Sequence, residues 1–298
     1  MRIATSQFYN RPASLMTQLT AEADKIQTQI ATGKRIQTAS DDPAAYLRLQ
    51  GLKQQKADDG AYASNITLAQ GILAQTDSTL DSVESQLQRA LELTTQAANG
   101  TMSDSNRQAV SEELKAIRDS LFGLANTKDV RGQPLFGGAT GNVAYTQATD
   151  GTISFAGTGE PSEIPIGEGI GIQGAVTGAR AFAAGGSDMF AILADFTAAL
   201  DAGGDVKAAA DTALGGVKAS LESVGLARAS AGARAARLDL DTERLADAGE
   251  ARESTRKELE DTDITTAVTD LQKTLTILQA TQASFTKLTA LSLFDYLR

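Results

Sequence analysis

Both ends of this 298-residue chain are patterned for helices that would be marginal alone. In residues 264–298 apolar side chains recur at alternating intervals of four and three positions, which is the spacing of a coiled-coil seam. Thr and Gln fill most positions between them, and Thr is a mediocre helix former. The seam runs through Ile264, Val268, Leu271, Leu275 and Leu278, and then through Gln282 to Phe285.

Residues 1–40 repeat this theme with Leu15, Leu19, Ile26 and Ile30. Surfaces that are poor in charge and apolar along one stripe are typical of interfaces. We therefore expect the two ends to pair with each other and with other subunits, as in a self-assembling protein.

The composition excludes several kinds of chemistry. The chain has no Cys and no His, so the common zinc, haem and iron–sulfur ligand sets and the Ser-His-Asp and Cys-His triads are not available. The net charge of −10 argues against a nucleic-acid partner. Residues 1–40 carry +3 and residues 264–298 carry +1, whereas the middle of the chain carries −14. We expect no cofactor, no metal and no catalytic residues.

No run of about 18 apolar residues occurs, which predicts no membrane insertion. The N-terminus lacks the short apolar core of a cleavable secretory signal. The sequence by itself therefore indicates a cytoplasmic protein or one exported without cleavage.

A long helix is expected over residues 43–98. Asp42 before Pro43 is typical of an N-cap followed by the first helical position. At 1.5 Å per residue this helix would be roughly 84 Å long. Asn99-Gly100 would end it, and Ser103-Asp104 would cap a return helix. The predicted buried seam of the first helix is Ile66, Ala69, Leu73, Thr76, Leu80, Val83, Leu87, Ala90, Thr94 and Ala97, and that of the second is Val110, Leu114, Ile117, Leu121 and Leu124.

The composition changes near residue 130. Residues 130–186 hold 14 of the 27 glycines and three of the five prolines, together with short alternating runs at 142–147, 152–156 and 162–166. Asp150-Gly151 is a hairpin signal between the first two runs. We expect a small β-rich insert here.

Helical patterning returns at Ser187. Met189, Ile192, Leu193, Phe196 and Leu200 would form one apolar face, a second helix would cover 205–223, and a final long helix would run from about 225 to 290. The predicted fold is mainly α: a long antiparallel helical rod with coiled-coil termini and a small β-rich inserted domain.

A GxGxxG run and two pairs of adjacent carboxylates are better explained by structural roles than by catalytic ones. Residues 169–174 match GxGxxG but lack the strand and helix that a dinucleotide site needs, so a glycine-rich turn region is expected. The adjacent carboxylates Glu112-Glu113 and Asp41-Asp42 point apart on a helix or cap one. An enzyme with a carboxylate site stays open as an improbable alternative, and a pocket of convergent Asp and Glu in the insert would support it.

The chain resembles the flagellin superfamily and, within it, the hook-associated protein 3 family of hook–filament junction proteins. The N-terminal matches are Met1-Arg2-Ile3, Thr32-Gly33-Lys34-Arg35-Ile36 and Ser40-Asp41-Asp42-Pro43-Ala44-Ala45. The later matches are the run from Ala98 to Asp104, Leu124-Ala125-Asn126-Thr127, Leu135-Phe136-Gly137-Gly138 and Leu291-Ser292-Leu293-Phe294-Asp295. Ala39 stands where the family pattern has Pro, and residues 130–186 carry no recognisable family signal.

The resemblance implies a flagellin-like protein with no enzymatic activity, exported uncleaved through the flagellar type III apparatus to the extracellular flagellum. It implies a homo-oligomeric ring between hook-associated protein 1 and flagellin, and a flagellar export chaperone that binds the C-terminal segment. A short flagellin that polymerises as the filament itself is the alternative.

The expected organisation has five parts. Residues 1–40 and 263–298 would be assembly helices, disordered in the monomer. Residues 41–129 and 187–262 would be the outgoing and return arms of the helical rod, and 130–186 the outer insert. The candidate assembly residues are Leu15, Leu19, Ile26, Ile30, Val268, Leu271, Leu275, Leu278, Phe285, Leu291, Leu293 and Phe294.

Overall fold

The computed structural model describes residues 2–99, 102–184 and 187–296. The chain forms two compact units. Unit 1 joins residues 1–58 to residues 247–298, and unit 2 comprises residues 59–246. Among the described residues, no helix is both long and apolar enough to cross a membrane.

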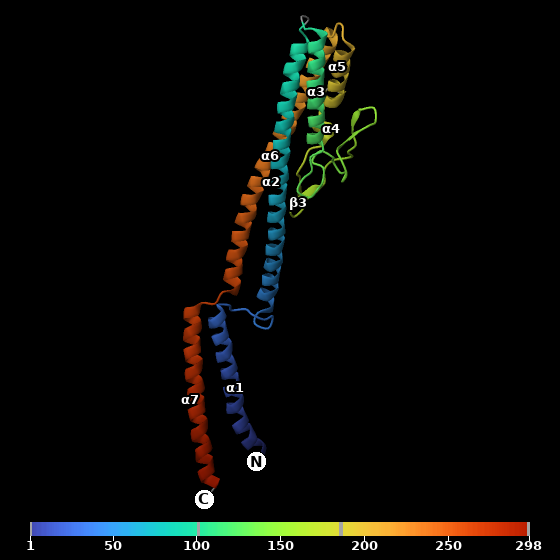
Figure 1. The fold of residues 1–298 in the computed structure, drawn as a ribbon. Helices are drawn as coiled ribbons and strands as arrows, with labels where there is room; N and C mark the ends of the chain where they lie inside the picture. Colours follow the sequence, from blue (N-terminus) through green and yellow to red (C-terminus); the bar gives the residue numbers. More distant parts are fainter. Residues whose placement is uncertain (1, 100–101, 185–186, 297–298) are drawn as a thin grey trace. The chain divides into compact units, whose positions relative to one another are not determined.

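Long helices build unit 2 (Figure 1): α2 (Pro43–Ala97), α3 (Asp104–Ala125), α5 (Met189–Ala202) and α6 (Lys207–Glu260), of which α2 and α6 continue into unit 1. The Asp42 carboxylate accepts the Ala45 amide at 3.0 Å and so caps α2, as the sequence predicts. Every residue of the seam predicted from Ile66 to Ala97 is buried, which confirms the heptad register of α2.

The return helix and the helix after the insert pack together within the same core. Ser103 caps α3 through the Asn106 amide, and Asp188 caps α5 through the Phe190 amide. Leu114 and Leu121 of α3 and Phe196 of α5 are fully buried, as predicted. Leu124 and Ile192 are only half-buried at the edge of this core.

The insert contains two antiparallel hairpins. Strand β1 (Tyr145–Gln147) pairs with β2 (Ile153–Phe155), and β3 (Glu163–Gly167) pairs with β4 (Ile170–Gln173). The predicted Asp150-Gly151 turn joins the first pair, because Gly151 has φ 84° and the Asp150 carboxylate accepts the Thr152 amide. Strand β4 was not predicted. It is formed by residues of the GxGxxG motif, so this motif belongs to an antiparallel hairpin and not to a strand-to-helix turn.

Aromatic side chains tie the insert to the helices. The rings of Phe136 and Phe182 lie 4.9 Å apart, and those of Tyr145 and Phe190 lie 5.0 Å apart. Phe182 follows the short helix α4 (Gly178–Ala181) and precedes a small ladder of β5 (Ala183–Ala184) and β6 (Ser187–Asp188). These rings are part of the same buried cluster as the seam of α2, so the insert shares its core with the helical body.

The expected helix boundaries after residue 205 were wrong. Helix α6 passes without a break through residue 224, and the break falls instead at residues 261–263. The buried positions Val217, Ser220 and Val224 keep one face of α6 against the core through the glycine-containing stretch. The break has a local cause, because the Asp263 carboxylate accepts the amides of Thr265 and Thr266 and so starts a new helix, α7 (Ile264–Tyr296).

Unit 1 brings the two ends of the chain together. Helix α1 (Arg2–Thr32) lies beside α7 and runs antiparallel to it (Figure 1). Gly33 ends α1 with φ 69°, a conformation that favours glycine. Ile36, Ala45 and Leu49 form a small separate core with Tyr46 and Leu259.

Candidate functional site

The paired terminal helices are the candidate site. The less exposed side chains of α1 recur at three- and four-residue intervals, and α7 is the element that α1 packs against. We call these residues and their counterparts on α7 the inner seam. On α1 it comprises Pro12, Met16, Leu19, Ala23, Ile26, Gln29 and Ile30, and on α7 it comprises Ala267, Leu271, Thr274, Leu278, Thr281 and Phe285.

The threonines of these helices are compatible with helical structure because their hydroxyls hydrogen-bond their own backbone. The donors reach the carbonyl four residues earlier at 2.7–3.0 Å. Their methyl groups then cover the helix surface without adding charge. These donors are Thr17, Thr20, Thr28, Thr32, Thr269, Thr276 and Thr281.

The candidate assembly residues divide into three groups. Six lie in the inner seam: Leu19, Ile26, Ile30, Leu271, Leu278 and Phe285. Three are exposed instead: Leu15, Val268 and Leu275, at 46%, 38% and 41%. The side chains of Leu291, Leu293 and Phe294 lie outside the described part of the chain, although the backbone of α7 extends past them.

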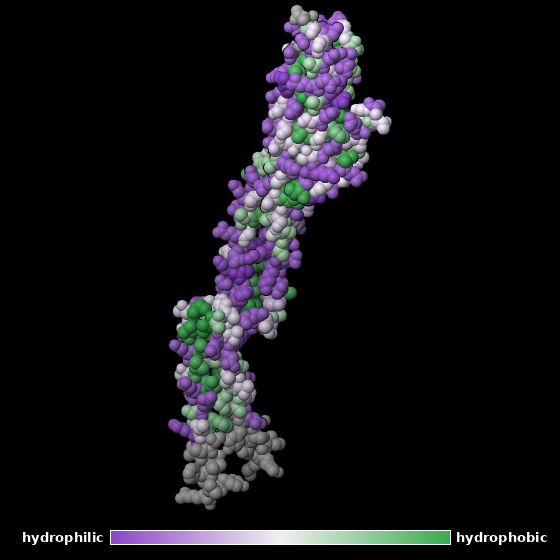
Figure 2. Space-filling model, viewed as in Figure 1, coloured by the Kyte–Doolittle hydropathy of each residue, from purple (hydrophilic) through white to green (hydrophobic). Residues whose placement is uncertain are grey.

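Three exposed apolar residues form a second stripe on α7 next to the inner seam, whereas the exposed Ile277 lies on another side of the helix. Ile264 is 45% exposed and shares one side of the helix with Val268 and Leu275. Figure 2 shows the corresponding hydrophobic patch over the N-terminal half of α7. Leu271 and Leu278 border both stripes, so α7 has an apolar surface wider than α1 covers.

A groove of about 510 Å³ lies further along the same helix pair. Pro12 and Leu15 of α1 and Phe285 of α7 supply its apolar lining, and Arg11 is its charged lining residue. Unit 1 therefore offers both protruding apolar side chains and a recess.

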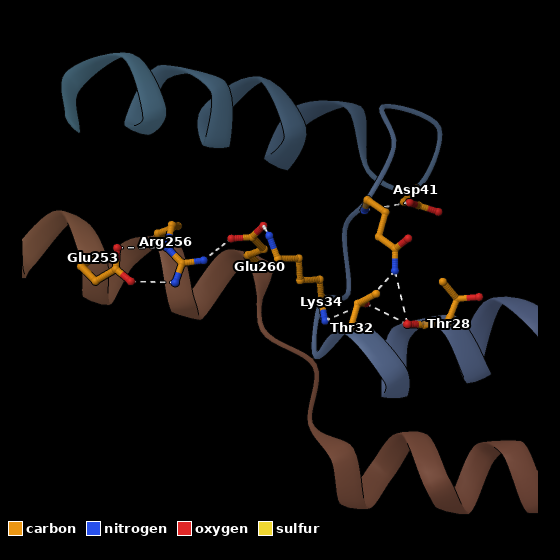
Figure 3. Close-up of polar contacts among 8 residues, drawn as sticks. Thr28, Thr32, Lys34, Asp41, Glu253, Arg256 and Glu260 are labelled. Atoms are coloured by element: carbon orange, nitrogen blue, oxygen red, sulfur yellow. Dashed lines mark hydrogen bonds and ion pairs between the residues drawn. The ribbon is translucent and has the colours of Figure 1, made fainter. Parts of the chain in front are cut away.

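A polar junction closes the helix pair at the end away from the termini. The Arg35 amide donates to the Glu260 carbonyl at 2.7 Å, and the Thr262 amide donates to the Gly33 carbonyl at 2.9 Å. These two backbone bonds tie the loop after α1 to the loop before α7. Lys34 adds an ion pair to the buried Glu260 carboxylate at 2.7 Å, and Arg256 binds Glu260 and Glu253 (Figure 3).

The ion-pair partners in this junction stabilise the ionised forms of its carboxylates. Hydrogen bonds from Arg256 lower the pKa of Glu253 to about 2. Burial raises the pKa of Glu260, but the hydrogen bonds from Lys34 and Arg256 outweigh burial and leave that pKa below its ordinary value. The junction therefore keeps its carboxylates ionised at neutral pH.

Asp41 orders the loop that follows. Its carboxylate binds Lys25 at 2.8 Å and accepts the amides of Gln37 and Thr38. The Lys25 hydrogen bond, followed by those amides, holds the pKa of Asp41 far below its ordinary range. Gln37 in turn donates to the Thr32 hydroxyl at 2.8 Å.

Sequence reasoning missed this junction. Its members are charged residues at loop positions, where periodicity carries no information. Two local signals were present: Gly33 followed by Lys34-Arg35, and Asp263 followed by Thr265 and Thr266 as an N-cap.

Two cavities of unit 2 near the insert do not resemble a carboxylate active site. One of about 350 Å³ in the insert is lined by a single acidic residue, Asp129, whose carboxylate is bound by Arg131 and by the Gln133 amide. A second of similar volume is lined by three acidic residues: Asp150 caps its own turn, Asp201 pairs with Lys115, and the side chain of Asp195 is exposed on α5. Within the described residues, no group of three or more acidic side chains is arranged to hold a metal ion.

Comparison of this chain with known proteins shows its family. The bacterial flagellin N-terminal helical region matches residues 3–140, and the bacterial flagellin C-terminal helical region matches residues 214–297. The chain is 32% identical to flagellar hook-associated protein 3 of Salmonella typhimurium over 99% of both chains. It is 31% identical to Flagellin A of Vibrio cholerae, but over only 44% of this chain and 34% of that protein.

The fold is shared with a solved flagellar hook-associated protein structure from Vibrio parahaemolyticus. The TM-score is 0.69 at 24% identity, covering 74% of this chain and all of the other. Near-complete alignment with a hook-associated protein 3, together with both flagellin helical regions, establishes the relationship. This chain belongs to the hook-associated protein 3 family of the flagellin superfamily.

Proposed function

We propose that this protein is a structural adaptor that forms the junction between hook and filament of the bacterial flagellum, an extracellular structure. In this proposal its subunits form a homo-oligomeric ring that contacts hook-associated protein 1 on one side and flagellin on the other. The observation that carries the proposal is the α1–α7 pair, whose inner seam is used within the subunit while Ile264, Val268 and Leu275 stay exposed.

We base the assembly role of α1 and α7 on how little apolar surface these two helices bury against each other. Their contact includes small or polar side chains such as Ala23, Thr274 and Thr281, so the pair buries little apolar surface for its length. We propose that α1 and α7 are disordered in the free subunit and become ordered on assembly, with Leu15, Val268 and Leu275 contacting other subunits.

Export is the second part of the proposal. The protein would leave the cell uncleaved through the flagellar type III apparatus, with an export chaperone bound to the C-terminal segment. The absence of cysteine is compatible with a chain that passes unfolded through a narrow channel. The role is structural and not enzymatic.

The alternative of a short filament-forming flagellin has less support. The similarity to Flagellin A covers about a third of that protein, whereas the similarity to a hook-associated protein 3 spans both chains.

The proposal is tested by complementation of a strain that lacks this protein. Leu275→Glu combined with Leu278→Glu places charge on the exposed stripe and on the inner seam, so we expect filament growth to be lost. Thr276→Glu combined with Ala280→Glu adds the same charge to the exposed side of α7 that faces away from the inner seam and from the exposed stripe, and is the matched control, expected to restore growth. Full filament growth by the first pair of substitutions would refute the assembly role of α7.

A further inference from the structure

No helix breaker explains why α6 ends at Glu260. Residues 250–298 contain neither Gly nor Pro, and the chain is helical on both sides of the break. The last helical bond of α6 is donated by the Asp261 amide and the next one by the Ala267 amide, each at 2.9 Å. Past Glu260 the chain leaves the axis of α6 (Figure 3), so the backbone groups in between need other partners.

The loop after α1 supplies three of these partners. The Leu259 carbonyl accepts the Arg35 guanidinium at 3.0 Å, and the Glu260 carbonyl accepts the Arg35 amide at 2.7 Å. The Thr262 amide donates to the Gly33 carbonyl at 2.9 Å. In a continuous helix each of these groups would instead bond the neighbouring turn. The loop therefore replaces the bonds that would carry α6 across the break.

Two side chains complete this exchange. The Asp263 carboxylate accepts two amides of the first turn of α7, which a continuous helix would pair with carbonyls of the preceding turn. Lys34 pairs with the buried Glu260 carboxylate at 2.7 Å and forms an antiparallel β-bridge with Asp261. Only the Asp263 cap is local to the break, since the other contacts come from the opposite end of the sequence.

The docked loop and a continuous helix exclude each other. The Thr262 amide has one hydrogen, so it bonds either the Gly33 carbonyl or the preceding turn of α6. Asp and Thr are mediocre helix formers, but neither stops a helix as Pro does. Without the loop, the exposed backbone groups at the end of α6 are best satisfied by further helical turns.

We infer that residues 261–263 switch between a break and a helix according to whether the loop after α1 is docked. With the loop docked, α6 ends at Glu260 and α7 pairs with α1. With the loop released, α6 continues as a helix through Thr265. The switch deepens the proposed function, on which it rests for the release of α1 before assembly. Ordering of the N-terminal segment thereby sets the direction of the C-terminal one.

A pair of histidines can report whether the helix crosses the break. Two histidines four positions apart on a helix bind one transition-metal ion together. The test pair is Asp261→His with Thr265→His, and the control pair is Glu250→His with Ser254→His within α6, all at exposed positions. The natural chain has neither His nor Cys and serves as the blank. Calorimetry measures Ni²⁺ binding to the purified full-length subunit at about pH 7.5.

Arg35→Pro should release the loop, because it removes both the amide and the guanidinium that bond α6. In this background we expect the test pair to bind Ni²⁺ within about threefold of the control pair. A chain with its loop docked should bind at least about tenfold more weakly, because only its helical fraction is competent. Gly33→Val, strained at φ 69°, is a second way to release the loop and should act alike. Weak binding by the test pair in both released backgrounds overturns the inference.

Assembly gives a second readout. In the deletion strain, Ni²⁺ in the medium should hold the test pair in a continuous helix and so prevent the loop from docking. We expect filament growth with the test pair to be lost on addition of Ni²⁺ and to return when the metal is chelated. Growth with the control pair should be the same in both conditions. Growth with the test pair that ignores Ni²⁺ would also overturn the switch.

The switch and the proposed function can fail separately. If α1 is disordered in the free subunit, the test pair should bind as tightly with the natural loop as with Arg35→Pro. Weak binding with the natural loop but tight binding with Arg35→Pro would keep the switch and reject that disorder. A working switch in a protein found along the whole filament would keep the switch and reject the junction role. A protein confined to the junction whose test pair binds weakly in every background would do the reverse.

Discussion

Lys34 and Glu260 form an ion pair with 2.7 Å between Nζ and Oε1, and the Glu260 side chain is only 6% exposed. The pair links the loop that follows the first helix to the last residue of α6, which lies 226 positions later in the chain. Two backbone hydrogen bonds beside it connect the same loops. Polar contacts thus fix the entry to the paired terminal helices, beside the small apolar core of Ile36, Ala45 and Leu49.

Removal of Glu260 should weaken the junction. Glu260→Ala leaves Lys34 and Arg256 without this carboxylate, at a cost of about 1–3 kcal/mol. We expect flagella with this variant to shed filaments under shear that the natural protein resists. The amount of flagellin released into the medium measures the effect. Glu258→Ala, at an exposed position on the same turn of α6, is the control and should shed no more than the natural protein.

The carboxyl group of Asp188 should make the stability of unit 2 depend on pH. Burial raises the pKa of this carboxyl above its ordinary value of 3.8, although the Phe190 amide and Tyr145 act in the opposite direction. Because the folded chain binds the proton more tightly, this group's contribution to stability is complete below pH 3.8 and is lost as pH rises through the folded pKa.

Asp188→Asn keeps an N-cap and removes the buried charge. It should raise the Tm of the purified subunit at pH 7 by about 2 °C, with the gain vanishing near pH 3.5. Circular dichroism melts at the two pH values measure it. A gain that persisted at the lower pH would show that the buried charge is not its cause.

Two adjacent glycines of α6 should respond in opposite directions. A Cβ on Gly216 would lie 2.8 Å from Ile192, whereas one on Gly215 would meet nothing within 4 Å. Gly215→Ala should therefore stabilise the subunit by about 0.5–1 kcal/mol through helix propensity. Gly216→Ala should destabilise it by about 1–3 kcal/mol through overpacking. Denaturant unfolding of the purified variants compares them, and equal effects would mean that α5 does not approach α6 so closely.

The terminal helices should differ in protection between the free and the assembled protein. If α1 and α7 are ordered only on assembly, a protease should cut the free subunit rapidly within residues 1–40 and 264–298 and leave unit 2 intact. The same segments should resist cleavage in isolated flagella. Resistance of residues 1–40 in the free subunit would contradict the proposed disorder.

The helices of the body could be predicted because their apolar residues define a single face that can be buried. From Ile66 to Ala97 only one face of α2 is apolar, and that face is buried. Helix α7 has two overlapping apolar heptads, which share Leu271 and Leu278. Hydrophobicity favours the one that contains Val268 and Leu275, but α1 packs on the one that contains Ala267 and Thr274. Small side chains allow a partner helix to approach α7 more closely. The pattern of α7 alone does not identify which helix that partner is.

The remaining errors also have physical causes. The sequence pattern suggested a helix boundary between residues 223 and 225, but tertiary packing of Val217 and Val224 keeps α6 continuous there. The junction depends on Lys34 and Glu260, which are far apart in the sequence. They lie together only because the loop after α1 contacts the loop before α7. No periodic signal contains that information, although the caps Gly33 and Asp263 marked both loops.

The position of the protein in the flagellum tests the central claim most directly. An antibody against the insert, residues 130–186, would be applied to intact flagella and detected with gold by electron microscopy. We predict label confined to a band where the hook meets the filament. Label along the whole filament would contradict the junction role and identify the protein as a flagellin.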